Sequence, residues 1–412
     1  MILTNARIVT FDSGNRVIDS GSVEIRPDGT IGFVKRGRVP GIDAGGRLLM
    51  PALINCHTHL YSTLARGIPL SGHPPANFRE ILKKVWWRLD RALNPDDVYY
   101  SALVGLIDSA KCGVGTVIDH HSSPSACSGS LDQIERAFHQ VGLRGATCYE
   151  TSDRDGALPA LIENARFISN RRPGTLVGAA FGLHASFTLS DPTLRACAEL
   201  NQSLGAAFHV HVAEDRCDRS AVTRLDRFGI LDERTLAAHC IHLSQSEHRI
   251  LAQRGVNVIH NPQSNCHNAV GTAVVPRGTL VGLGTDGYSP RMWDELKMSL
   301  HLQKLGAHDP RTAYAEALLN NRDIVKKIWQ WQLGRIETGV LADLVLADYF
   351  PPTPIHAGNL FGHLLFGISN APVDSLIVNG QFVVRDRQCV NVDERRIAAK
   401  AAARAKALWE RL

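Results

Sequence analysis

The chain has 412 residues, of which 44% are hydrophobic and 21% are charged, and its formal net charge is +5. These values are typical of a globular protein with two domains, or one large barrel with additions, and they exclude a disordered or highly charged chain. Basic residues are scattered, so the run RRIAAKAAARAK near the C-terminus is interpreted as a solvated helix face and not as a nucleic-acid-binding patch.

No segment indicates export or insertion into a membrane. The first residues, MILTNARIVTFDSG, lack the basic start and apolar core of a signal peptide, and no apolar stretch is long enough to span a bilayer. The nine cysteines include no C-x-x-C pair, which indicates free thiols in a reducing compartment. We therefore expect a cytoplasmic protein with neither membrane nor nucleic-acid partners.

The two ends of the chain share a β-rich texture. Residues 1–50 alternate short β-rich runs with turns, and similar runs return after residue 334, where Asn379-Gly380 is a strong hairpin signal. The sequence predicts a small composite β-sandwich domain formed by residues 1–50 and 335–392. Residues 393–412 are rich in Ala and Arg and predict a C-terminal helix that packs on the rest of the protein.

The middle of the chain carries eight short apolar runs separated by helical patterns. The helical segments, such as 130–143 and 191–205, end near a glycine. Strands that alternate with helices form parallel βα units, and eight units fit a (β/α)₈ TIM barrel. We therefore predict an α/β fold with a catalytic barrel over residues 51–334. The eight runs are 52–59, 114–121, 144–151, 176–185, 206–214, 235–243, 256–264 and 280–287.

Nearly every run ends in polar or titratable side chains. The active site of a TIM barrel lies at the C-terminal ends of its strands, and 18 histidines scattered at random would not fall so consistently there. The pattern predicts that the chemistry of this protein is concentrated at one face of the barrel. The side chains are His57, His59, Asp119, His120, Glu150, His184, His209, His211, Glu214, His239, His242, His260, Asn261 and Asp286.

Four of these residues predict a metal site. His57 and His59 stand at positions i and i+2 of a strand, so their side chains point to the same face. A catalytic metal needs a few protein ligands and one open position for water, and His211 offers a third ligand. His209 is interpreted as a buried, hydrogen-bonded histidine of the barrel interior. Asp286 alone would be a turn or cap residue, but beside three histidines it is predicted to be a ligand and a base.

The long segment 60–93 follows the first run and would cover the mouth of the barrel. Its arginines and tryptophans are candidates for holding an aromatic or anionic group, although both tryptophans could instead belong to a helix core. Histidines after the second run could contact substrate or be structural, and Cys266 is interpreted as a loop thiol, with the role of His267 open. The candidates in these segments are Arg66, Trp86, Trp87, Arg88, His120, His121, Arg291 and Trp293.

The ordered motifs MPALINCHTHL, HVHVAE, AAHCIHL, HNPQSN and GLGTDG, followed by GRIETGVLADLVLAD, closely resemble those of the metal-dependent amidohydrolase superfamily. Within it, the chain is similar to the branch of triazine hydrolases, adenosylhomocysteine-type deaminases and guanine deaminases. The stretches VWWRLDRAL and VIDHHSSPSACSGSL resemble the SsnA-type aminohydrolases. The resemblance covers essentially the full chain.

The resemblance also implies roles for individual residues. It gives the metal ligands as His57, His59, His211 and Asp286. It implies that Glu214 is the acid/base glutamate, that His239 stabilises the reaction intermediate and that His184 contacts substrate. No lysine ends the fourth run, so a bridging carbamylated lysine is not evident and one divalent metal ion is expected. Three histidines and an aspartate suit Zn²⁺, while Fe²⁺ and Mn²⁺ accept similar donors.

The implied activity is hydrolytic deamination of an amino-substituted N-heterocycle, purine- or pyrimidine-like, by metal-activated hydroxide with release of ammonia. Asp286 would accept the proton of the water, and Glu214 would protonate a ring nitrogen and then the leaving amine. Hydrolysis of a cyclic amide or another C–N bond at the same site is the alternative. A binding protein that kept the barrel is disfavoured because every ligand is present. The resemblance suggests a homodimer or higher homo-oligomer.

Overall fold

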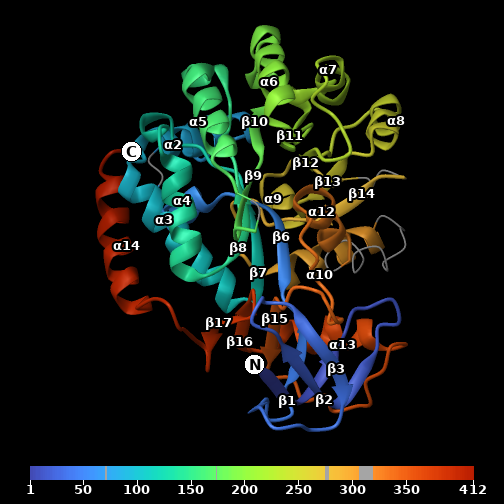
Figure 1. The fold of residues 1–412 in the computed structure, drawn as a ribbon. Helices are drawn as coiled ribbons and strands as arrows, with labels where there is room; N and C mark the ends of the chain where they lie inside the picture. Colours follow the sequence, from blue (N-terminus) through green and yellow to red (C-terminus); the bar gives the residue numbers. More distant parts are fainter. Residues whose placement is uncertain (70–71, 173, 274–277, 306–318) are drawn as a thin grey trace.

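The structure, a computed structural model, describes residues 1–69, 72–172, 174–273, 278–305 and 319–412. Its strands form two parallel sheets and one mixed sheet. Figure 1 shows the mixed sheet at one end of the molecule, below the parallel strands and the helices around them. The parallel sheets are described first because their strand ends carry the candidate site.

Each strand of the two parallel sheets lies within one of the eight predicted runs. β9 and β10 are separated by a single residue and together occupy the fourth run. Isolated bridges join Thr58 to Asp286 and Thr151 to Leu183, so the two sheets are linked at both edges. This is the predicted TIM-barrel type of fold. The strands are β6 (Leu53–Thr58), β7 (Val114–Asp119), β8 (Arg144–Thr147), β9 (Val177–Ala179), β10 (Phe181–Ala185), β11 (Phe208–Val212), β12 (Leu236–His239), β13 (Asn257–His260) and β14 (Leu280–Leu283).

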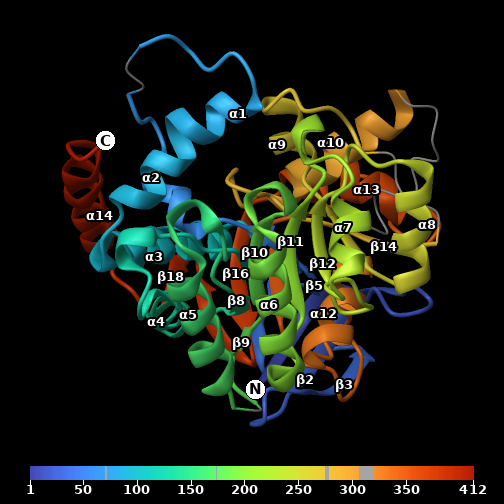
Figure 2. The ribbon, with the colours of Figure 1, turned by 90° about the horizontal axis from the view of Figure 1, so that it is seen from above.

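Helices surround the parallel strands, as Figure 2 shows from above. The strands are buried almost throughout, since helices cover the outer face of such a sheet. The two helical segments singled out in the sequence end at Gly142 and Gly205, both in the left-handed region that favours glycine. None of the described helices is long and apolar enough to cross a membrane. The helices are α1 (Phe78–Ile81), α2 (Trp87–Ala92), α3 (Pro95–Lys111), α4 (Ser130–Val141), α5 (Ala157–Ser169), α6 (Asp191–Leu204), α7 (Ala221–Arg227), α8 (Gln245–Arg254), α9 (Pro262–His267), α10 (Met292–Leu305), α12 (Asn321–Trp329), α13 (Leu360–Phe366) and α14 (Glu394–Trp409).

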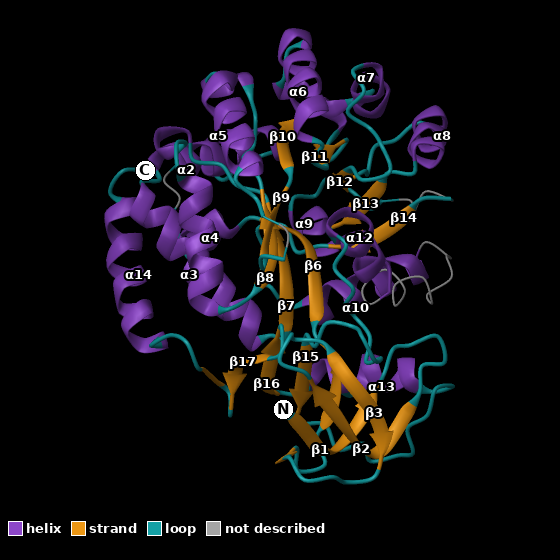
Figure 3. Ribbon diagram, in the orientation of Figure 1, coloured by secondary structure: helices purple, strands orange, loops and turns teal. Residues whose placement is uncertain are grey.

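Strands from both ends of the chain form the mixed sheet, whose strands are orange at the lower end of Figure 3, with helix α13 beside them. Leu344 of β15 pairs with Pro51 of β5, so the C-terminal strands continue the N-terminal ones. Asn379 and Gly380 have φ angles of 50° and 75°, the left-handed values that a tight hairpin turn requires, and the predicted hairpin between β16 and β17 is confirmed. The strands are β1 (Ile2–Val9), β2 (Val17–Ile25), β3 (Ile31–Arg36), β4 (Ile42–Asp43), β5 (Leu48–Pro51), β15 (Leu344–Ala347), β16 (Val373–Val378), β17 (Gln381–Arg385) and β18 (Gln388–Cys389).

The C-terminal helix α14 lies along α3 (Figure 1). Arg404 donates to the carboxylate of Asp97 at 2.9 Å, and the Trp409 indole donates to the backbone oxygen of Leu64, also at 2.9 Å. Within the helix only Ile397, Ala401 and Leu408 are buried. The basic side chains of this helix therefore point mainly to solvent, as the sequence predicted.

A buried ion pair connects the barrel to the mixed sheet. Arg144 of β8 donates two hydrogen bonds to Asp343, at 2.8 and 3.2 Å, and their side chains are 4% and 2% exposed. We expect Asp343→Ala to lower the free energy of unfolding by about 3–5 kcal/mol, because Arg144 would keep a buried charge without its partner. Urea denaturation measures this loss.

The matched control is Asp19→Ala. Asp19 pairs with Arg7 at 3.3 Å, but its side chain is 77% exposed. Its loss is expected to lower the free energy of unfolding by no more than about 1 kcal/mol, because water and salt screen an exposed pair. Equal losses in the two variants would contradict the assigned role of Asp343.

Candidate active site

The side chains predicted to bind a metal converge at the C-terminal ends of β6, β11 and β14. His59 Nε2 lies 3.2 Å from His211 Nε2 and 3.1 Å from Asp286 Oδ1, and His57 Nε2 lies 4.0 Å from the same carboxylate oxygen. Four tetrahedral donors at the usual zinc distances are separated from one another by about 3.4 Å. The spacing of these donors is therefore close to that of a metal site.

Hydrogen bonds fix which ring nitrogen each of these histidines offers. His59 Nδ1 donates to the backbone oxygen of His120 at 2.6 Å, and His211 Nδ1 donates to that of His184 at 2.8 Å. Because a neutral imidazole carries one proton, Nε2 of each ring keeps its lone pair. His57 Nε2 is buried without a hydrogen-bond partner in the described parts of the chain. The donor set fits one divalent metal ion.

Glu214 and His239 lie beside these donors. His239 Nε2 is 3.6 Å from Glu214 Oε2 and 3.9 Å from Asp286 Oδ2. Burial raises the pKa of Glu214 to about 7, against the opposing effect of His239. Burial also tends to raise the pKa of Asp286, but its interactions with His59 and His239 and the hydrogen bond from Ser264 hold that pKa well below the usual value of an aspartate. One carboxylate can thus hold a proton near neutral pH while the other stays ionised.

The short helix α9 orients these three side chains. Ser264 Oγ donates to Asp286 Oδ2 at 2.5 Å, and Asn265 Oδ1 accepts from His239 Nδ1 at 2.8 Å. Just after the helix, Asn268 donates to Glu214 Oε1 at 3.5 Å. The sequence analysis did not identify Ser264, Asn265 or Asn268 as site residues. The motif HNPQSN was a signal for the first two, because it places both on one turn after a strand that ends in the site.

The backbone at the site is strained. His239 and Asp286 have φ angles of 74° and 53°, a left-handed conformation that residues other than glycine rarely adopt. Such strain persists where surrounding contacts impose it, and it gathers at functional sites. Both residues lie at or just beyond the end of a buried strand, and His239 Nε2 and Asp286 Oδ2 lie 3.9 Å apart.

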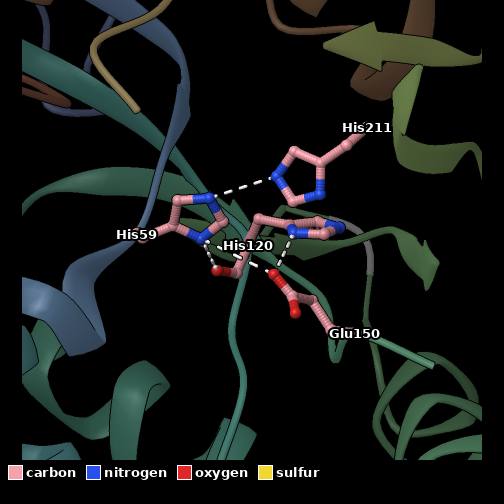
Figure 4. A group of neighbouring side chains, drawn as sticks. All are labelled: His59, His120, Glu150 and His211. Carbon is pink, nitrogen blue, oxygen red and sulfur yellow. Dashed lines mark hydrogen bonds and ion pairs between the residues drawn. The ribbon is translucent and has the colours of Figure 1, made fainter. Parts of the chain in front are cut away.

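Two further side chains, His120 and Glu150, lie beside the proposed ligands His59 and His211, and Figure 4 shows all four. Glu150 Oε1 lies 3.1 Å from His120 Nδ1 and 3.8 Å from His59 Nδ1, and His120 Nε2 lies 3.1 Å from the backbone oxygen of His209. Donor atoms of His59, His120, Glu150 and His211 lie within 4.8 Å of one another. Both ring nitrogens of His120 thus lie at hydrogen-bond distance from an oxygen atom of the protein.

A cavity of about 880 Å³ opens over the donors and reaches under the segment that precedes α3. Pockets of this size accept a ligand larger than a single ring system. Phe78 and Leu82 pack with Val270, which follows α9, so this segment closes over the strand ends as the sequence predicted for a lid. The residues that line the cavity include the aromatic residues Tyr61, Phe78, Trp86, Trp87, Phe187 and Tyr288 and the polar residues His59, Arg66, Asp90, Glu150, His184, His211, Glu214, Ser264, His267, Asn268 and Asp286.

Of the predicted substrate contacts, Arg66, Trp86 and His184 line this cavity. The side chain of Arg66 is 65% exposed and pairs with Asp108 at 2.9 Å. His184 lies deeper, where burial lowers its pKa to about 3 and keeps the ring neutral. Both tryptophans of the segment are partly exposed on the cavity wall, so neither is a fully buried core residue.

The structure does not place Arg88, His120 or Trp293 along the cavity, contrary to the predicted substrate contacts. Arg88 is exposed on α2, and Trp293 is 8% exposed within the main hydrophobic core. His120 is fully buried beneath the ligands. His209 is buried and hydrogen-bonded, as predicted, and Cys266 is exposed on α9.

Comparison with known proteins gives one family and several relatives. A model described as the amidohydrolase family matches residues 48–383. The chain is 32% identical to a protein of Desulforudis audaxviator named 5-methylthioadenosine/S-adenosylhomocysteine deaminase, over 100% of this chain and 99% of that one. It is 29% identical to a 5'-deoxyadenosine deaminase of Methanosarcina mazei, again over 100% and 99% of the two chains.

Solved structures share the fold. An adenosine deaminase of Xanthomonas campestris with bound zinc superimposes with a TM-score of 0.86 at 22% identity, covering 99% of this chain and 98% of that one. Atrazine chlorohydrolase of Arthrobacter aurescens, complexed with zinc, superimposes with a TM-score of 0.82 at 21% identity, over 98% and 99% of the chains.

Proposed function

The chain belongs to the amidohydrolase family, and we propose that it is a metal-dependent hydrolase that deaminates an amino-substituted N-heterocycle with release of ammonia. The observation that carries the proposal is the convergence of Nε2 of His57, His59 and His211 with the carboxylate of Asp286, directly beside Glu214 and His239. Relatives over the full chain length are named as deaminases of adenosine derivatives.

In this proposal His57, His59, His211 and Asp286 hold one divalent ion. Zn²⁺ suits three imidazoles and a carboxylate, although Fe²⁺ and Mn²⁺ accept similar donors. Two solved structures of the same fold contain zinc. When bound, such an ion acts as a Lewis acid and lowers the pKa of a coordinated water towards about 7.

The remaining steps fall to the protein's own proton carriers. Asp286 is ionised and accepts a proton from the attacking water at its carboxylate. Glu214, with its pKa of about 7, delivers a proton to a ring nitrogen. It then takes up the second proton of the attacking water and passes it to the departing amine, and the proton held by Asp286 returns to Glu214 at the end of the cycle. His239, whose Nε2 lies 3.6 Å from Glu214 Oε2 and 3.9 Å from Asp286 Oδ2, is proposed to stabilise negative charge that develops on the substrate, a role that requires Nε2 to carry a proton as well as Nδ1.

The cavity supports a purine-like substrate that carries a substituent. Its volume of about 880 Å³ exceeds what a bare ring needs, and aromatic side chains such as Trp86, Trp87 and Phe187 offer faces on which a ring can stack. The relatives act, by their names, on 5-methylthioadenosine, S-adenosylhomocysteine and 5'-deoxyadenosine. Arg66, Trp86 and His184 are the proposed substrate contacts.

The domain division is also a proposal. Residues 51–334 form the catalytic barrel, residues 1–50 and 335–392 form a composite sandwich-type domain, and residues 393–412 pack on the barrel. The pairing of β5 with β15 and the contacts between α14 and α3 support it. Nine unpaired cysteines support a cytoplasmic location. A homodimer or higher oligomer is proposed on the family resemblance.

An ammonia-release assay tests the proposed function. Zinc-loaded protein is incubated with adenosine, 5'-deoxyadenosine, 5'-methylthioadenosine, S-adenosylhomocysteine, cytosine and cyclic amides. We expect one ammonia for each amino heterocycle consumed, with a matching change in ring absorbance, and none from chelator-treated protein. Opening of a cyclic amide without ammonia would contradict deamination and support the alternative of amide hydrolysis at the same site.

A further inference from the structure

His57 is held differently from the other proposed ligands. The Nδ1 protons of His59 and His211 go to backbone carbonyl oxygens, which can only accept. His57 Nδ1 instead faces Nε2 of His209 at 2.9 Å, with both rings fully buried and inclined at 71°. A ring nitrogen can either donate or accept. Either nitrogen of this pair can therefore be the donor of the hydrogen bond between His57 and His209.

We propose that His209 is a positioning residue that accepts the Nδ1 proton of His57 and thereby keeps the lone pair of His57 Nε2 directed at the metal. The inference rests on the proposed metal site. His57 Nε2 has no hydrogen-bond partner in the described residues and faces Asp286 Oδ1 at 4.0 Å. Were Nε2 to carry the proton, His57 could not bind a metal at all.

The contacts of the other ring nitrogen of His209, Nδ1, are consistent with His209 accepting a hydrogen bond at Nε2. If Nε2 of His209 accepts, its Nδ1 carries the proton, and that nitrogen lies 3.8 Å from Cys148 Sγ. The Cys148 thiol in turn lies 3.7 Å from the backbone oxygen of Asp119, to which its proton can go. In this arrangement His57 donates to His209, His209 donates to Cys148, and Cys148 donates to the backbone oxygen of Asp119. The chain of hydrogen bonds runs from His57 on β6 through β11 and the segment after β8 to β7.

The position of His209 follows from the strand that carries it. His209 and His211 stand at i and i+2 of β11 and so point to the same side of the strand. His211 reaches the metal donors directly, and His209, one layer deeper, reaches the back of His57. One strand thus supplies a ligand and the group that orients another ligand.

Removing the proposed acceptor, the His209 ring, is expected to weaken metal binding. In His209→Leu the His57 Nδ1 proton would be buried without a partner, or the ring would move that proton to Nε2 and lose its lone pair. Loss of a hydrogen-bonding partner behind a metal ligand lowers metal affinity by about 10–100-fold. His209→Gln keeps an amide oxygen at the reach of Nε2 and is expected to restore most of the affinity.

The test measures zinc affinity of the full chain by competition with a chromogenic chelator. We expect the Kd for zinc to rise about 10–100-fold in His209→Leu and by less than about threefold in His209→Gln. The matched control is His260→Leu, because His260 is also a buried strand-end histidine and neither of its ring nitrogens bonds to a described residue. Its affinity for zinc is expected to equal that of the wild type.

Three outcomes overturn the inference while leaving the proposed function intact: His209→Leu binds zinc as tightly as the wild type, His209→Gln loses as much affinity as His209→Leu, or His260→Leu loses as much as either. A wild-type protein that binds no zinc would instead overturn the proposed function itself. If His209→Leu does not fold, the zinc-loaded wild type decides the matter by NMR. A scalar coupling between two histidine ring nitrogens across a hydrogen bond is expected, and its absence refutes the inference.

Discussion

Asp286→Ala is expected to abolish zinc retention and turnover together. Asp286 Oδ1 lies 3.1 Å from His59 Nε2 and supplies the one anionic donor of the proposed ligand set. Its removal takes away both a ligand and the group that accepts the proton of water. We expect the dialysed variant to hold no zinc by elemental analysis, and its kcat/KM for ammonia release to fall at least about 10³-fold.

A second variant separates loss of the carboxylate from backbone strain. Asp286 has a φ angle of 53°, which alanine adopts at a cost but asparagine tolerates. Asp286→Asn should therefore fold normally and still lose turnover. The control is Asp294→Ala, an exposed carboxylate on α10 that pairs with Arg291, which should keep wild-type zinc and activity. Zinc retention by both Asp286 variants would rule this residue out as a ligand.

The strands and the proposed ligand set were accessible from sequence because both follow from local rules. A buried parallel strand is a short apolar run, and in HTH and HVH the alternation of a strand sends both histidines to one side. The C-terminal ends of parallel strands meet at one face, so His57, His211 and Asp286 could be placed together without coordinates.

The residues of segment 60–93 that line the cavity were less accessible from sequence, because which side chains face the cavity depends on how a helix is rotated. Residues Leu82–Trp86 form a π-helical segment between α1 and α2. Such a segment carries more residues per turn than an α-helix and shifts the phase of everything after it. Trp86 and Trp87 both reach the cavity wall, while Arg88 is exposed.

Residues that orient other site residues through hydrogen bonds were the hardest to identify from the sequence. Asn265 matters because its amide oxygen meets His239, and Ser264 because its hydroxyl meets Asp286. The partners lie at or beyond the ends of other strands, more than twenty residues away. The motif HNPQSN places Ser264 and Asn265 near the site, but it does not show which residues they bond to. The prediction for His209 was incomplete for the same reason. Its burial was predicted, but its bond to His57 could not be, because it spans 152 residues of sequence.

Glu214→Gln is expected to leave zinc binding intact and remove most of the turnover. Glu214 Oε2 lies 3.6 Å from His239 Nε2. Glu214 is adjacent to the proposed metal ligands but is not one of them. Glutamine keeps the size of the side chain and can still bond to Asn268, but it cannot deliver a proton. The expected fall in kcat is about 10²–10⁴-fold, the range for loss of a general acid.

The experiment measures bound zinc and kcat on the same samples, with Glu199→Gln, an exposed position on α6, as the matched change. If Glu214→Gln lost zinc, Glu214 would be a ligand, and the proton chemistry would need another residue. If it kept both zinc and activity, the proton would reach the ring by another route, and His239 would be the nearest candidate. Zinc retained with turnover lost is the result that only a proton carrier outside the ligand set explains.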